Sequence, residues 1–187
     1  GTLILFRPES LEQSKKVSLW GNKVWDVTSV LYDKGIVWIS TVGQGILRYH
    51  VASGHADRIT YQENNKENSL SHTDVFRVVP IKNDRYLAVT WSGYTLLLQD
   101  KDNPEKMTTE IYNNTASQLH RSLETRMISA YYDPNGIVWI GTNGGGVMYS
   151  DLRSQFYNQF HQERHNEVCG IVMDGRKYVW MATFHQG

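Results

Sequence analysis

The chain lacks the features that mark several large classes of protein. A single cysteine, Cys169, excludes an intrachain disulfide and a cysteine-rich metal site. We expect this side chain, which precedes an apolar strand, to be a small buried hydrophobe. Basic and acidic residues both number 19, so no net charge points to nucleic acid or to an anionic membrane surface. No apolar run approaches the roughly 20 residues of a membrane span, and 2–6 lacks the basic leader of a signal peptide. We therefore expect no nucleic-acid partner and no direct membrane contact.

Aromatic residues and glycines are abundant instead. The 187 residues include 6 Trp, 11 Tyr and 15 Gly. A buried aromatic ring removes about 150–250 Å² from water, so these side chains are expected to dominate the core. A chain of this length predicts one domain, 1–187, with two small domains as the alternative.

One sequence frame recurs along the chain. "YDKGIVWISTVGQGILRY" (32–49) matches "YDPNGIVWIGTNGGGVMY" (132–149) almost position by position. A third copy starts at Val172, and a degraded copy starts at Asn83 with Leu87 at the Trp position. Ser-Leu precedes the first predicted strand in three copies. The frames lie near residues 33–49, 84–98, 133–149 and 174–187.

The period of roughly 40–50 residues fits the four strands of a β-propeller blade. "VWIST" and "VWIGT" are β-branched and aromatic and are bounded by turn residues, which rejects paired helices. The glycines at 144–146 fall between two predicted strands, with no helix signal and no Gly-Lys-Ser/Thr behind them, so they indicate a turn and not a phosphate loop. The predicted fold is all-β, with about four repeats of four antiparallel strands.

The frame resembles the two-component regulator propeller repeat. The fullest match is carried by Asp133, Gly136, Trp139, Gly141, Thr142 and Gly145. The resemblance implies the extracytoplasmic, periplasmic sensor region of a hybrid two-component histidine kinase, which senses oligosaccharides through larger propellers and signals to a kinase outside this chain. The chain is then expected to be a fragment of a larger propeller whose remaining blades are its partners. We expect 2–6 to be a strand of a neighbouring or closing blade, so that the piece either closes as a ring or associates with a second copy as a homodimer.

The repeated positions are predicted to be structural. We expect the repeated tryptophans to pack between sheets, the threonines to bond to backbone at strand ends, and the turn aspartates to cap their turns. These sets are Trp38, Trp139 and Trp180; Thr41, Thr90, Thr142 and Thr183; and Asp33, Asp84, Asp133 and Asp174.

The variable positions within the frame are the candidate binding site. Residues just after each Thr, and residues that enter each first strand, should gather on one propeller face near its axis. A saccharide site needs a flat aromatic ring and polar groups, and solvated loop residues are the alternative interpretation. The predicted ligand-binding residues are Trp91, Phe184, His185, Asn143 and Arg126. We expect no catalytic residue, cofactor or metal; His161, Glu163 and His165 could share a strand face but lack the His-Glu-x-x-His order.

The leading hypothesis is a ligand-binding sensor module without catalysis. The alternatives are a propeller-fold glycosidase or lyase, because "DKGIVW" resembles the Asp-box turn of sialidases, and a protein-interaction scaffold.

Overall fold

The computed structural model consists of antiparallel β-sheets. It describes residues 2–10, 12–19, 25–64, 68–82, 84–103, 105–113, 126–151, 156–160, 167–175 and 178–184, with backbone alone at 113, 150, 156–160, 167 and 184. The strands are β1 (Thr2–Phe6), β2 (Gln13–Ser18), β3 (Val27–Asp33), β4 (Ile36–Thr41), β5 (Gly45–His50), β6 (Ala56–Ile59), β7 (Val75–Ile81), β8 (Arg85–Thr90), β9 (Gly93–Gln99), β10 (Met107–Asn113), β11 (Arg126–Tyr132), β12 (Ile137–Asn143), β13 (Val147–Asp151), β14 (Phe156–Phe160), β15 (Glu167–Asp174) and β16 (Tyr178–Phe184). No helix occurs in these ranges.

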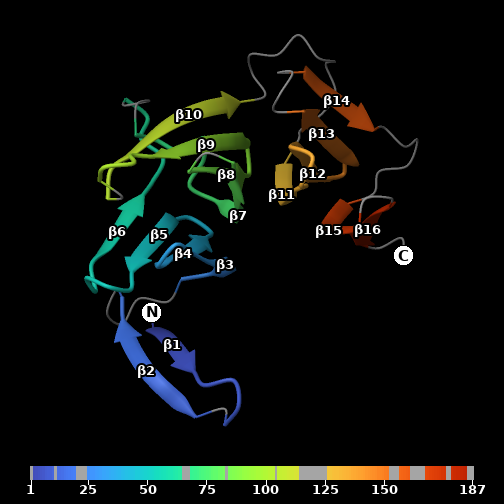
Figure 1. Ribbon diagram of the computed structural model, residues 1–187. Helices are drawn as coiled ribbons and strands as arrows, with labels where there is room; N and C mark the ends of the chain where they lie inside the picture. The colour runs from blue at the N-terminus through green and yellow to red at the C-terminus, as the bar shows by residue number, and fades with distance from the viewer. Residues whose placement is uncertain are drawn as a thin grey trace.

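Three sheets of four strands form successive units, which we call blade I (β3–β6), blade II (β7–β10) and blade III (β11–β14). Within each blade the strands lie in sequence order, and the inner strands of successive blades face one another. Two-stranded sheets, β1–β2 and β15–β16, stand at the two ends of the arc that the blades form (Figure 1). The predicted all-β fold with four-stranded antiparallel repeats is confirmed.

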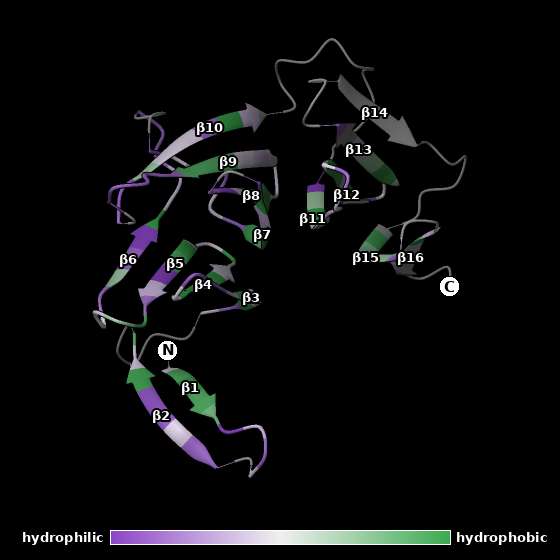
Figure 2. Ribbon diagram, in the orientation of Figure 1, coloured by the Kyte–Doolittle hydropathy of each residue, from purple (hydrophilic) through white to green (hydrophobic). Residues whose placement is uncertain are grey.

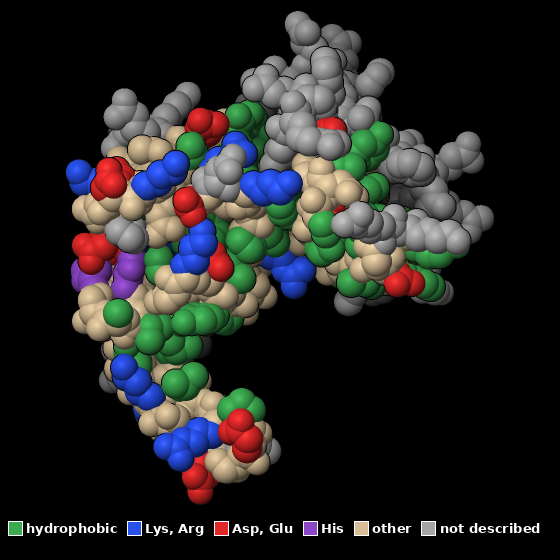
Figure 3. All heavy atoms as spheres, in the orientation of Figure 1, with side chains coloured by type: hydrophobic (Ala, Val, Ile, Leu, Met, Phe, Trp, Pro, Cys, Tyr) green, Lys and Arg blue, Asp and Glu red, His purple; other side chains and the backbone are tan. Residues whose placement is uncertain are grey.

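The N-terminal hairpin packs beside blade I. β1 pairs with β2, and Figure 2 shows a hydrophobic β1 next to a largely hydrophilic β2. Hydrophobic side chains gather where the hairpin meets blade I (Figure 3), around a cavity of about 240 Å³ whose lining includes Leu3, Val17, Val30 and Tyr49. β1 is thus a strand beside a blade, and the proposal that it closes the last blade stays a prediction.

The first strand of each repeat carries a bulge at the same place. The register of pairing shifts between Val27 and Ser29, Val75 and Arg77, Met127 and Ser129, and Val168 and Gly170. A bulge leaves one residue out of the ladder and breaks the in-out alternation of side chains. Cys169 is such a residue, and it is exposed. The prediction of a buried Cys169 is therefore wrong, because it assumed an uninterrupted strand.

The core lies between the blades. Trp38 is fully buried, and its ring lies 4.3 Å from that of Tyr86 in blade II. Trp139 packs against an apolar cluster that includes Val168 of the next sheet. Packing of the repeated tryptophans between sheets is confirmed for these two. Trp180 is 59% exposed, because no described sheet packs over its face of β15–β16.

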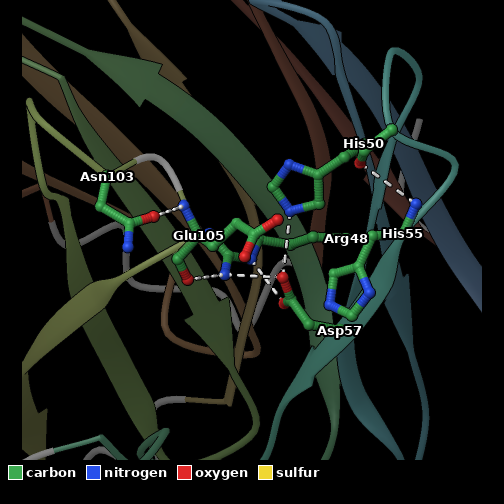
Figure 4. A network of polar contacts seen from close by, with 7 residues as sticks. Arg48, His50, His55, Asp57, Asn103 and Glu105 are labelled. Atoms are coloured by element: carbon green, nitrogen blue, oxygen red, sulfur yellow. Dashed lines mark hydrogen bonds and ion pairs between the residues drawn. The ribbon is translucent and has the colours of Figure 1, made fainter.

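A buried arginine joins blades I and II at their outer strands. The Arg48 side chain is 3% exposed and forms a bidentate pair with Asp57, with distances of 2.7 Å from Nε to Oδ1 and 2.8 Å from Nη2 to Oδ2. Nη2 also donates to the backbone carbonyl of Glu105, in the β9–β10 loop, at 2.7 Å. His50 Nε2 lies 3.0 Å from Asp57 Oδ2, as Figure 4 shows. This network fixes the outer edge of one blade to the next.

Three of the four repeated threonines bond to backbone at the ends of their strands, as predicted. The hydroxyls of Thr41, Thr90 and Thr142 donate to the carbonyls of Gly45, Gly93 and Gly146 at 2.7, 3.0 and 2.8 Å. In the turn that follows Thr142, Gly144 and Gly146 have φ of 87° and 77°, between β12 and β13. The glycine cluster is confirmed as a strand connection.

The turn aspartates divide between two roles. Asp133 Oδ1 accepts the backbone N–H of Ile137 at 2.9 Å and caps its own turn, as predicted. Asp33 instead accepts the Tyr86 hydroxyl of blade II at 2.7 Å, and Asp84 pairs with Lys34 of blade I. Burial of the Tyr86 hydroxyl is the main cause that raises its pKa, and the hydrogen bond to Asp33 is the second. These two contacts hold blades I and II together at the turn between first and second strands.

Candidate functional site

The candidate site lies at the ends of the blades where the second strand turns into the third. These ends are opposite the turns that carry the repeated aspartates. The residue after the repeated Thr faces the residue that enters the first strand. In blade III this pair is Asn143 and Arg126, which are ladder partners. In blade II the backbone N–H of Trp91 donates to the backbone carbonyl of Asp74 at 3.1 Å. In blade I the backbone N–H of Val42 makes the equivalent bond to the carbonyl of Asp26 at 2.9 Å.

The entering residues of blades II and III also reach the preceding blade. The Asp74 carboxylate of blade II accepts the Gly43 N–H of blade I at 2.7 Å. One blade further on, the Arg126 guanidinium carbon lies 4.4 Å from the centre of the Trp91 ring. This distance is typical of a cation–π contact. The same position thus carries an acid at one blade junction and a stacked arginine at the next.

The Trp91 ring contacts one residue of β7 and one residue of β11. Its ring centre lies 5.6 Å from that of Phe76, the bulged residue of β7, with the ring planes inclined by 30°. Trp91 and Arg126 are both half-buried, as is Asn143. The site therefore combines an indole ring, a guanidinium group and a side-chain amide at the junction of blades II and III, at the edge of the solvent.

The five predicted site residues have different outcomes. The structure brings Trp91, Arg126 and Asn143 together. Phe184 ends β16, but its side chain lies outside the described residues, as does all of His185. The membership of those two in the site stays a prediction.

One further residue of this face, Phe76, was missed from the sequence, whereas Asp74 is one of the strand-entering residues that were expected to gather here. Phe76 contacts Trp91 because the β7 bulge redirects it, and bulges have no marker in the sequence. Asp74 lies at the junction of blades I and II, where its carboxylate accepts the Gly43 N–H and its backbone N–H donates to His72 Nδ1 at 3.0 Å.

Within the described ranges, no three His, Cys, Asp or Glu side chains are grouped to hold a metal ion. The candidates His161, Glu163 and His165 lie outside those ranges. Nor does the described part contain a helix that could span a membrane.

Comparison with known proteins agrees with this architecture. The family model described as two component regulator propeller matches residues 123–144, which include Arg126 and Asn143. No curated protein sequence matches the chain.

Solved structures share the fold at low sequence identity. The extracellular domain of a protein described as a hybrid two component system of B. thetaiotaomicron superposes with a TM-score of 0.70 at 20% identity, over 89% of this chain and 22% of that one. A second B. thetaiotaomicron extracellular domain, described as a one component system, gives 0.72 at 15% identity, over 96% and 22%. PorZ, a surface component of the type-IX secretion system of Porphyromonas gingivalis, gives 0.67 at 16% identity, over 95% and 28%.

The sheets and these comparisons define a set of β-propeller blades. The chain spans about a fifth of the length of the extracellular domains that it matches. At residues 123–144 it carries the two-component regulator propeller repeat that its sequence resembles.

Proposed function

We propose that the chain is part of the extracytoplasmic sensor propeller of a two-component signalling system, and that it binds an oligosaccharide at the junction of blades II and III. Binding is then transmitted to a kinase domain outside this chain. The observation that carries the proposal is the grouping of Trp91, Arg126 and Asn143 at one blade junction, within or next to the matched repeat.

The chemistry of this group suits a saccharide. An indole ring offers an apolar face to sugar C–H groups, and amide and guanidinium donors can bind hydroxyl or acidic oxygens. The ring and its polar neighbours belong to different blades, so a ligand that contacts both would bridge two sheets. Such a bridge would couple ligand binding to the angle between the two blades.

The same face gives little support to catalysis. Glycoside hydrolysis uses two carboxyl groups on either side of the scissile bond. Asp74 enters the first strand of blade II on this face, and its Oδ1 is already bonded to the Gly43 N–H of blade I. A binding function therefore explains the arrangement better than a glycosidase or lyase does.

A thermal-shift screen of the chain against neutral and acidic oligosaccharides tests the proposal. A ligand that binds only the native state raises the melting temperature. We expect a concentration-dependent rise with at least one saccharide, lost in Trp91→Ala and kept in Val42→Ala, which changes the equivalent position of blade I. No rise with any saccharide, or an equal rise in Trp91→Ala, would contradict binding at this junction. Release of reducing ends from a bound saccharide would favour the enzyme instead.

A further inference from the structure

Arg77 differs from the residues at the same place in the other repeats. It follows the bulge of β7, where the other first strands carry Ser29, Ser129 and Gly170. The hydroxyls of Ser29 and Ser129 bond to neighbouring strands. The Arg77 side chain is exposed, and within the described part of the chain it forms no hydrogen bond, ion pair or ring contact. The repeat frame therefore does not require a guanidinium group at this position.

A pocket of about 420 Å³ lies beside this arginine. Its lining includes Arg77 of blade II and residues from both strands of the β15–β16 sheet. β7 and β15 are the first strands of their repeats, and Figure 1 shows both on the inner, concave side of the arc. Sites for small molecules typically occupy about 300–1,000 Å³. The pocket is therefore large enough for a small organic ligand.

The wall that β15–β16 contributes to the pocket is apolar. It includes Ile171, Trp180 and Met181, and the side chains of Trp180 and Met181 are 59% and 52% exposed. Indole rings stack on other aromatic rings, and methionine sulfur also makes favourable contacts with them. The described lining of this wall contains no acidic, amide or hydroxyl side chain that could bind the hydroxyls of a sugar. An apolar ring fits this wall better than a saccharide does.

We propose that this pocket binds an aromatic carboxylate. Arg77 forms a bidentate, charge-assisted pair of hydrogen bonds with the carboxylate, while Trp180 and Met181 contact the ring. Because no described side chain pairs with Arg77, the incoming acid displaces no protein partner from it. The ligand then contacts both blade II and the β15–β16 sheet. This pocket is distinct from the junction that holds Trp91, so the inference does not rest on the proposed function.

Cys169 makes occupancy of the pocket measurable. It is the single cysteine of the chain, it is exposed, and it lines the same pocket. Its Sγ lies 3.4 Å from the backbone carbonyl oxygen of Ala182, another lining residue. A bound ligand should therefore slow alkylation of this thiol by iodoacetamide, which is small and uncharged.

Alkylation in the presence of two matched ligands tests the site. Phenylacetate and phenylacetamide share a ring and differ in charge. We expect phenylacetate to slow alkylation of Cys169 in a saturable way, and phenylacetamide to bind about tenfold or more weakly because it forms no charged pair. Arg77→Met should remove this difference, and Arg77→Lys, which keeps the charge without the planar fork, should reduce it. Each variant is compared with its own rate without ligand, and its melting temperature shows that it is folded.

Three controls separate this pocket from other sites. Arg58→Met, which removes an exposed arginine of blade I, and Trp91→Ala should both leave the protection by phenylacetate unchanged. Digalacturonate, whose carboxylates stand on polar sugar rings, should protect Cys169 no better than phenylacetamide does. Equal protection by acid and amide, no protection by either, or protection that survives in Arg77→Met would overturn the proposal. So would loss of protection in Trp91→Ala, or protection by digalacturonate equal to that by phenylacetate.

Discussion

Replacement of Arg48 by Met should be one of the most damaging single changes at the blade I–II junction. The guanidinium is 3% exposed, pairs with Asp57 through two bonds of 2.7 and 2.8 Å, and donates to the Glu105 carbonyl at 2.7 Å. It also lies 5.6 Å from the centre of the Trp38 ring. Met keeps much of the apolar stem but removes every one of these polar contacts.

The expected cost follows from the burial of the two partners. Loss of one partner from a fully buried ion pair costs about 3–5 kcal/mol. Asp57 is 24% exposed and keeps its contact with His50, so its carboxylate is partly solvated after the change. We therefore expect a loss of about 2–3 kcal/mol of unfolding free energy, below the fully buried range. At about 2–4 °C per kcal/mol for a chain of this size, the melting temperature falls by about 4–12 °C.

Urea denaturation of Arg48→Met, with Arg58→Met as the control, measures this loss of unfolding free energy. Arg58 lies on the adjacent strand β6 but is exposed, with a surface bond to Gln44 of 3.0 Å. An exposed polar contact of this kind contributes about 0–1 kcal/mol. A double-mutant cycle with Asp57→Asn should show strong coupling to Arg48. If the two arginine variants unfold at the same urea concentration, or if the cycle shows no coupling, the network does not stabilise the blade junction as described.

Two further changes test one contact between blades and one close approach within blade I. Because the folded pKa of Tyr86 is raised above 10.0 by burial and by its bond to Asp33, its contribution to stability is full below pH 10 and is lost as the pH rises further. The unfolding free energy of the unmodified chain should therefore exceed that of Tyr86→Phe at pH 8, and this difference should shrink above pH 10; a constant difference up to pH 11.5 would refute the assignment. Gly45→Ala should destabilise the chain by at least about 2 kcal/mol more than Gly43→Ala. Both glycines have φ of 77°, but an added Cβ meets the Ile59 carbonyl oxygen at 2.2 Å only at position 45, so equal melting temperatures would disprove the clash.

The sequence predicts the blades well because their signals are local. Each copy of the frame places a turn residue, an apolar strand and a glycine turn within about 20 residues. The hydroxyl of Thr142 and the glycines after it need only their own hairpin to take up their geometry, and they do so. The burial of Trp38 was predicted from repetition at one strand position, but it depends on packing against Tyr86 of blade II.

Contacts between blades were harder to predict because they join variable positions. The Asp33–Tyr86 bond depends on a tyrosine that only blade II carries at that strand position. The stacking of Arg126 on Trp91 depends on the offset between two sheets, which no local pattern encodes. The bulge that exposes Cys169 likewise breaks the alternation on which strand predictions rely.

Saccharide binding at the junction of blades II and III is tested most directly by the indole N–H resonances of the tryptophans. The chain, labelled with ¹⁵N, would be titrated with the saccharide that stabilises it most in the thermal-shift screen. The account predicts that the Trp91 indole resonance, assigned from Trp91→Phe, moves in a saturable way while that of the fully buried Trp38 stays fixed. A stabilising saccharide that leaves Trp91 unmoved would place the binding site elsewhere and contradict the central claim.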